Sequence, residues 1–126
     1  MEKPYALPKS ERLSSLAAVR RLFQDGASGF VYPFRYMVIT EKSATPTVEA
    51  LFSVPKRYHK RANKRNTLRR RTKEAYRLNK ATLTSSALAK SQTLDIALVY
   101  SSKEILPYKT IEYAICKILN EIVERY

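Results

Sequence analysis

Apolar and polar residues alternate over two segments in the first half of the chain, which is the pattern of half-buried β-strands. A strand over residues 34–40 places Phe34, Tyr36 and Val38 on one face and Arg35, Met37 and Ile39 on the other. A second strand over residues 48–54 alternates in the same way and ends at Pro55, which has no N–H to continue a ladder. A short apolar group at residues 30–32 is a further candidate strand. Residues 94–100 are nearly all apolar and predict a strand covered on both faces.

Other segments have helical spacing. Ser10 is a suitable N-cap for a helix that runs to about Gln24 and stops at Asp25-Gly26. Most apolar side chains of that helix lie on one arc, which comprises Leu13, Leu16, Ala17, Val19 and Phe23. Leu22 lies outside this arc. A second helix is predicted from about Asn63 to Lys80, with its continuation through residues 81–90 left open, and a third follows Pro107. Residues 1–9 contain two prolines and predict an extended arm.

This order of elements predicts a single domain over residues 1–126. We expect an α+β or α/β two-layer sandwich, with one small mixed sheet of about four strands and three helices. No apolar run approaches the length of a membrane span, and the N-terminus lacks the apolar stretch of a signal peptide. With a single cysteine, Cys116, which we assign to packing, the chain fits a reducing compartment, and we expect a cytoplasmic protein.

The net charge of +13 changes this picture because of where it lies. Residues 56–80 hold twelve lysines and arginines and one carboxylate, Glu74, whereas the other 101 residues hold twelve cations and ten acids. Such a concentration of like charge repels itself and is suited to a polyanion, with nucleic acid the leading candidate.

On the predicted helix over 63–80, helical spacing separates a weakly apolar stripe from a polar ridge. The stripe expected to pack comprises Leu68, Thr72, Ala75, Tyr76 and Asn79; the ridge on the opposite side comprises Asn66, Arg70, Lys73 and Arg77. Glu74 is spaced to pair with Arg70 and with Arg77 or Arg71. The stripe is too polar for a membrane-surface helix. Among aromatic residues that could stack on unpaired bases, Phe23 is the preferred candidate over Phe30, Tyr32 and Tyr36.

The chain lacks the usual groups of a protein nuclease. His59 is the only histidine and is expected to be a solvated loop residue, and no glycine-rich phosphate loop or metal-ligand spacing is present. We therefore predict no catalytic and no metal-binding residue in the chain. A structural RNA-binding protein, such as a ribosomal or assembly factor, is an alternative hypothesis, and a DNA-binding regulator is a weaker one, because a strand and loop precede the basic helix.

Residues 62–77 read ANKRNTLRRRTKEAYR, and this segment resembles the basic motif of the bacterial ribonuclease P protein component. Residues 51–57 (LFSVPKR), Leu22-Phe23 with Gly26, and residues 95–99 (DIALV) resemble other segments of that family in the same order. Thr67 departs from the motif, which has arginine at this position.

The resemblance implies a left-handed βαβ crossover and a protein that assists a catalytic RNA in removing the 5′ leader of precursor tRNA, with Mg²⁺ held through the RNA and no DNA or membrane partner. It implies a cleft for the single-stranded leader between the sheet and the basic helix, lined by Val19, Phe23, Met37, Asn66, Arg70 and Lys73. It also implies that Arg61, Arg65 and Arg69 face the catalytic RNA. With the remaining cations of the segment, the expected RNA-binding set is Lys56, Arg57, Arg61, Arg65, Asn66, Arg69, Arg70, Lys73 and Arg77.

Overall fold

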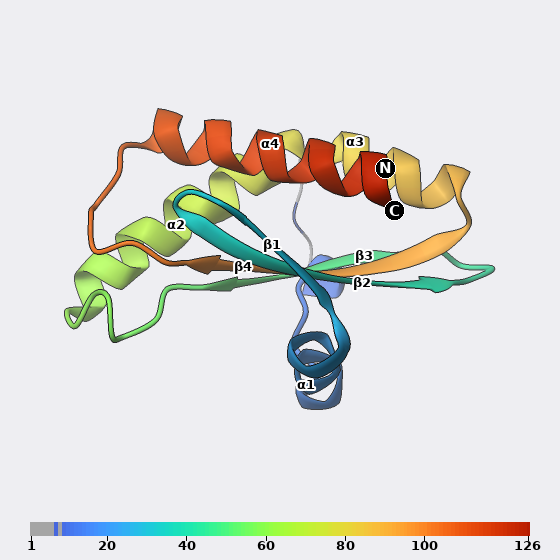
Figure 1. The fold of residues 1–126 in the computed structure, drawn as a ribbon, viewed down its shortest axis with the longest axis horizontal. Helices are drawn as coiled ribbons and strands as arrows, with labels where there is room; N and C mark the ends of the chain where they lie inside the picture. Colours follow the sequence, from blue (N-terminus) through green and yellow to red (C-terminus); the bar gives the residue numbers. More distant parts are fainter. Residues whose placement is uncertain (1–6, 8) are drawn as a thin grey trace.

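The alternating segments pair into one four-stranded mixed sheet in the order β1-β2-β4-β3 (Figure 1). The computed structural model describes residue 7 and residues 9–126, and its strands are β1 (Ala27–Val31), β2 (Phe34–Lys42), β3 (Val48–Ser53) and β4 (Gln92–Tyr100). β2 pairs antiparallel with β1 and β4, whereas β3 pairs parallel with β4. β4 therefore lies inside the sheet, which explains its nearly unbroken apolar sequence.

Among the described residues, four α-helices cover the sheet, one more than the sequence predicted. They are α1 (Leu16–Asp25), α2 (Ala62–Asn79), α3 (Ala81–Ala89) and α4 (Tyr108–Arg125). Residues 81–89 form a helix of their own: α2 ends at Asn79, and Lys80 lies between the two helices. Figure 1 shows α2, α3 and α4 on one face of the sheet and α1 on the other. No helix in the described part of the chain combines the length and the apolar character needed to span a bilayer.

The first helix starts later than predicted. Ser15, not Ser10, is the N-cap of α1, and its hydroxyl accepts the N–H of Ala18 at 3.4 Å. The residues before it are held elsewhere: Lys9–Glu11 form a 3-10 helix, and the N–H of Leu13 donates to Ala50 of β3 at 2.9 Å. This pairing with the sheet edge competes with helix formation. Of the arm predicted at residues 1–9, residues 1–6 and 8 lie outside the described residues.

Two separate apolar clusters hold the layers together. The larger one joins the Tyr36 and Val38 side of the sheet to α2, α3 and α4, and the smaller one joins Met37, Ala97 and Val99 to Leu22 of α1. The strand faces predicted for β2 and β3 are therefore confirmed. The apolar arc of α1 is not its buried side, because Leu22, which lies outside the arc, is fully buried while Leu16 and Phe23 remain 65% and 48% exposed.

The chain passes from β3 through α2 and α3 into β4, so the basic helix lies within a crossover between parallel neighbours. Such a crossover is usually right-handed; the left hand implied by the resemblance stays a prediction. The crossover places α2 beside α4 and above β3, which determines which side of the basic helix is buried.

Gly29 of β1 is directly opposite Tyr36 of β2, and a Cβ at this position would overlap the Tyr36 ring. Because Tyr36 is buried, its ring cannot move aside. We expect Gly29→Ala to lower the free energy of unfolding by about 1–3 kcal/mol through overpacking, measured by urea denaturation. Ser28→Ala, at an exposed neighbour on the same strand, is the matched control. Equal stability of the two variants would contradict this packing.

Candidate nucleic-acid interface

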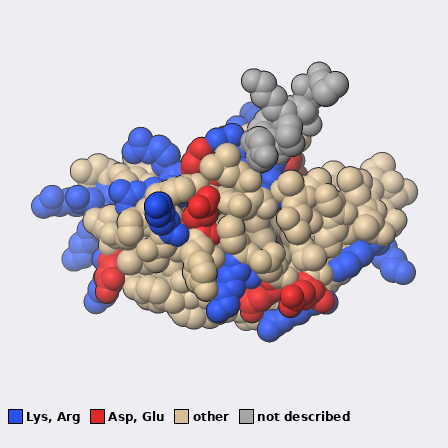
Figure 2. All heavy atoms as spheres, turned by 90° about the horizontal axis from the view of Figure 1, so that it is seen from above, with Lys and Arg blue, Asp and Glu red and all other residues tan. Residues whose placement is uncertain are grey.

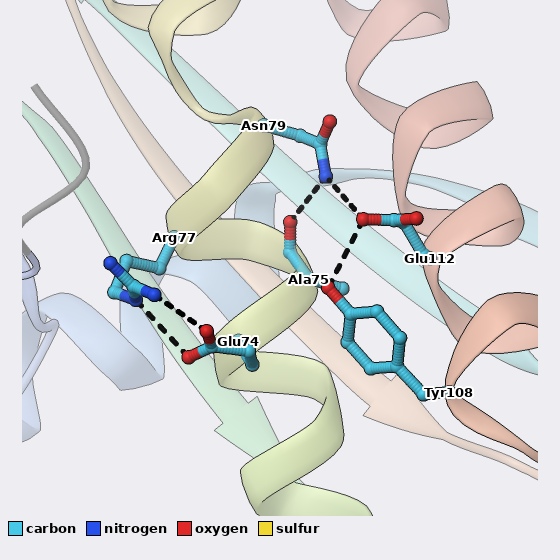
Figure 3. Close-up of polar contacts among 6 residues, drawn as sticks. All are labelled: Glu74, Ala75, Arg77, Asn79, Tyr108 and Glu112. Carbon is cyan, nitrogen blue, oxygen red and sulfur yellow. Dashed lines mark hydrogen bonds and ion pairs between the residues drawn. The ribbon is translucent and has the colours of Figure 1, made fainter.

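The predicted stripe of α2 is the side that packs. Four residues of the stripe are buried, namely Leu68, Thr72, Ala75 and Tyr76. The Tyr76 ring packs edge-on against the Phe52 ring, with 5.3 Å between the ring centroids. Asn79 ends the stripe, where its side-chain amide donates to the carbonyl of Ala75 at 2.7 Å (Figure 3). Burial of this stripe orients the rest of the helix, so the ridge predicted on the opposite side faces outward.

A groove of about 330 Å³ runs along that ridge, lined by Leu7, Asn66, Arg69, Arg70, Lys73, Glu74 and Arg77. Four cations and one carboxylate thus line one open depression. Arg70 is exposed and Lys73 half-buried, and neither bonds to a described residue. Their charges are available to an anionic ligand along the helix.

Arg77 is the partner of Glu74, as Figure 3 shows. The Nε of Arg77 donates to Glu74 at 3.1 Å, and this hydrogen bonding holds the pKa of the Glu74 carboxyl below its usual value. Of the pairings predicted for Glu74, the one with Arg77 is confirmed, and Arg70 does not share it. The carboxylate therefore neutralises one end of the groove and leaves Arg70 and Lys73 uncompensated.

Other cations of the segment are used within the fold. Lys80 is buried and donates to Glu11 at 2.6 Å, which ties the N-terminal 3-10 helix to the end of α2. Arg71 donates to the carbonyl of Leu106 at 2.7 Å, and Arg69 donates to the side chain of Asn66 at 3.2 Å. The net charge of the segment therefore overstates the charge available to a ligand.

The turn before α2 carries the remaining predicted contacts. Lys56, Arg57 and Arg61 are exposed there, and Arg65 is partly buried because its Nη1 donates to two backbone carbonyls of the turn. Figure 2 shows lysines and arginines gathered at the left end of the molecule, the end at which α2 begins in Figure 1.

The prediction for His59 is wrong. Only 7% of its surface is exposed, and its Nε2–H donates to the carbonyl of Ser102 at 2.7 Å. Solvation was expected because the residues around it are charged, but its ring packs 5.8 Å from the ring of Tyr100.

The six residues expected to line one leader cleft do not come together. Asn66, Arg70 and Lys73 line the groove on α2, whereas Val19 and Met37 belong to the small apolar cluster on the other face of the sheet. The main core fills the space between the sheet and α2, so the described residues form no cleft there. Met37 is buried beneath α1 and does not line a surface. Of the three predicted cleft residues on the α1 side, Phe23 alone exposes a large part of its side chain.

A second aromatic residue on that face was underestimated by the sequence analysis. Phe30 is 59% exposed and is paired across the hairpin with Arg35, which is also exposed. Opposite residues in a strand pair share a face, so both lie on the α1 side with Met37. The two-residue connection Tyr32-Pro33 joins β1 to β2 and sets this register. Counting outward from that connection along the sequence would have identified Phe30 and Arg35 as partners.

The opposite end of the α1-side face is acidic. Glu49 of β3 is directly opposite Asp95 of β4. Burial raises the pKa of the Glu49 carboxyl, and the negative charge of Asp95 adds a smaller increase. Burial also raises the pKa of Asp95, whose Oδ1 is buried without a hydrogen-bond partner. In the described part of the chain, no group of three or more histidine, cysteine, aspartate or glutamate side chains is placed to bind a metal ion. Burial raises the pKa of the Cys116 thiol.

The Asp95 carboxyl binds a proton more readily in the folded chain than in the unfolded one, so its contribution to stability falls as the pH rises from about 4 through its folded pKa. We expect Asp95→Asn to raise the free energy of unfolding at pH 7, with the gain disappearing near pH 3, where both states are protonated. Denaturant unfolding at a series of pH values measures this. Glu104→Gln, in an exposed loop, is the control, and a gain that does not depend on pH would contradict the prediction.

Comparisons with known proteins agree on one family. The sequence model of the Ribonuclease P family matches residues 7–123. The ribonuclease P protein component of Porphyromonas gingivalis strain ATCC 33277 is 36% identical over 120 residues, covering 94% of this chain and 87% of the relative.

Solved structures share the fold. The ribonuclease P protein of Thermotoga maritima aligns with a TM-score of 0.65 at 21% identity, covering 88% of this chain and 96% of that one. That of Staphylococcus aureus aligns with a TM-score of 0.63 at 16% identity, covering 92% and 97%.

Proposed function

This chain belongs to the family of ribonuclease P protein components, and from that premise we propose which of its surfaces hold RNA. As a member of the family it is the protein subunit of ribonuclease P, the ribonucleoprotein endonuclease that matures the 5′ end of tRNA. Its partner is the ribonuclease P RNA. The residues that contact RNA, and the binding of the precursor tRNA leader, are the substance of the proposal.

The catalytic RNA binds along the outer side of α2. The observation that supports this most directly is the open groove in which Arg70 and Lys73 bond to no described residue. Phosphates of an RNA backbone fit such a groove, because arginine and lysine donors then replace released counterions. The exposed cations of the turn before α2 extend the same surface toward the start of the helix, namely Lys56, Arg57 and Arg61.

The 5′ leader of precursor tRNA binds on the α1 side of the sheet. Phe23 and Phe30 both expose their rings there, and single-stranded bases stack on such rings without a requirement for sequence. Arg35, paired with Phe30, supplies a cation for a leader phosphate. The carboxylates Glu49 and Asp95 lie at the other end of this face and repel a polyanion, so they confine the leader to the Phe30 end.

The chemistry of cleavage belongs to the RNA in this proposal. Mg²⁺ ions bind through the ribonuclease P RNA, and the cations of this chain reduce the repulsion between phosphates brought together in the complex. The protein positions two RNA molecules relative to each other and contributes no nucleophile. Its place of action is the cytoplasm.

Arg70→Ala is the test of the α2 groove. Losing one phosphate contact should weaken binding to the ribonuclease P RNA and lower the slope of log K against log salt by about 0.7–0.9, measured by filter binding at four salt concentrations. Lys117→Ala removes an exposed cation on α4, away from the groove, and should leave the slope unchanged. An unchanged slope for Arg70→Ala would remove that side chain from the interface.

The paired variant Phe23→Ala/Phe30→Ala is the test of the leader surface. Each lost stack should cost about 1–3 kcal/mol in binding of precursor tRNA by the reconstituted holoenzyme. The loss should vanish with a precursor whose leader is a single nucleotide. Tyr113→Ala removes an even more exposed ring, from α4, and serves as the control.

The same reconstitution tests the role in cleavage. We expect accurate 5′ maturation at low Mg²⁺ only when protein and RNA are combined. Cleavage by the protein alone, or RNA binding that leaves cleavage unchanged as for a structural RNA-binding protein, would contradict the proposal.

A further inference from the structure

The turn that joins β3 to α2 carries exposed cations but little backbone structure of its own. Lys56, Arg57 and Lys60 are all exposed, and the turn's internal backbone bonds are those from the N–H groups of Tyr58 and His59 to the carbonyl of Pro55, at 3.2 and 3.4 Å. Neighbouring cations repel one another. A turn of this kind needs fixed points outside itself if its charges are to keep one arrangement.

The side chain of His59 is one such fixed point. It is buried, packs against the ring of Tyr100 and donates through Nε2–H to the carbonyl of Ser102 at 2.7 Å. Neither the α2 groove nor the leader surface uses this histidine. Its partner belongs to the loop over residues 101–107, which lies at the same end of the molecule in Figure 1.

That loop is itself held firmly. The Tyr100 hydroxyl donates to the carbonyl of Glu104 at 2.6 Å and accepts the N–H of Leu106 at 3.2 Å. The N–H of Ser101 donates to Pro33 at 2.8 Å, and the Tyr32 and Ser102 hydroxyls are hydrogen-bonded at 3.0 Å. Through His59 the cationic turn is therefore attached to a loop with several bonds to the sheet and the hairpin.

Arg65, in the first turns of α2, supplies the second fixed point. Its Nη1 donates to the carbonyls of His59 at 2.9 Å and Lys60 at 2.7 Å. The resemblance implied that Arg65 faces the catalytic RNA, but this nitrogen is occupied by the chain's own backbone. Lys64, its neighbour in sequence, is exposed and bonds to no described residue.

We propose that His59 and Arg65 are positioning residues that hold Lys56, Arg57 and Lys60, together with Lys103 of the 101–107 loop, as one rigid surface for phosphates of the ribonuclease P RNA. Lys103 is exposed and follows directly after the anchored Ser102. Because the cations are ordered before binding, the complex loses less conformational entropy when it forms. This inference rests on the proposed function, since it assigns a surface to the same RNA partner.

His59→Leu gives the sharpest test, because it removes an anchor without removing a cation. We expect binding to the ribonuclease P RNA at pH 8 to weaken about tenfold, as for a lost buried hydrogen bond. We also expect the slope of log K against log salt to fall by about one, because the cations of a loosened turn no longer neutralise phosphates at fixed positions. His59→Gln keeps an N–H donor at similar reach and should restore most of both. Lys103→Met should lower the slope by about 0.7–0.9.

Two controls separate positioning from general stability. Ile122→Val, in the main core on α4, destabilises the fold modestly and should leave RNA binding unchanged while the protein stays folded by circular dichroism. In a chain carrying Lys56→Met, Arg57→Met and Lys60→Met, the substitution His59→Leu should have no further effect on affinity, because the cations of the turn that it positions relative to Lys103 are gone.

The outcomes distinguish this inference from the proposed function. A wild-type protein that fails to bind the ribonuclease P RNA overturns both. Normal wild-type binding with an unaffected His59→Leu variant overturns only the inference. So does a loss of affinity that persists in the triple-methionine background, or one accompanied by an unchanged salt slope.

Discussion

Burial of one narrow stripe of α2 is the constraint on which the rest of the structure depends. Leu68, Ala75 and Tyr76 carry the helix into the main core, and every other side of that helix is rich in cations that repel one another. The apolar contact offsets this repulsion and sets the rotation of the helix about its axis. Once that rotation is set, Asn66, Arg70 and Lys73 must line an outward groove. Packing therefore decides which of the charges are presented on the surface.

The sheet then divides the molecule into two sides. Its α2 side is closed by a large core, whereas its α1 side is covered only over Met37, Ala97 and Val99, and Phe30 and Arg35 stay exposed at one end. The surfaces proposed for the ribonuclease P RNA and for the precursor tRNA leader therefore do not overlap. The anchored turn at the start of α2 adds order to the first surface, in a place where sequence composition suggests only solvated charge.

The errors of the sequence analysis have physical causes that can be named. Ser10 and Ser15 are equally good caps locally, and the choice between them is made by the bond from Leu13 to Ala50, two segments far apart in the chain. Leu22 lies outside the apolar arc of α1, yet it is buried because the sheet approaches that side. His59 is surrounded by charged residues in sequence, and only the neighbouring loop and Tyr100 make its site buried. Each error concerns a contact between distant segments, which local periodicity does not contain.

By itself, the sequence determined the properties that arise from local pattern: the alternating strands β2 and β3, the buried β4, the packing stripe and polar ridge of α2, and the concentration of charge that indicates nucleic acid. These follow from backbone periodicity and composition, which are properties of neighbouring residues. Only the tertiary structure decided that Phe23 and Arg70 lie on opposite sides of the sheet, that Lys80 is neutralised by Glu11, and that Arg65 holds the chain's own turn. Those outcomes depend on which layers the crossover brings together, because a side chain's partner across a core or a loop is set by packing in three dimensions.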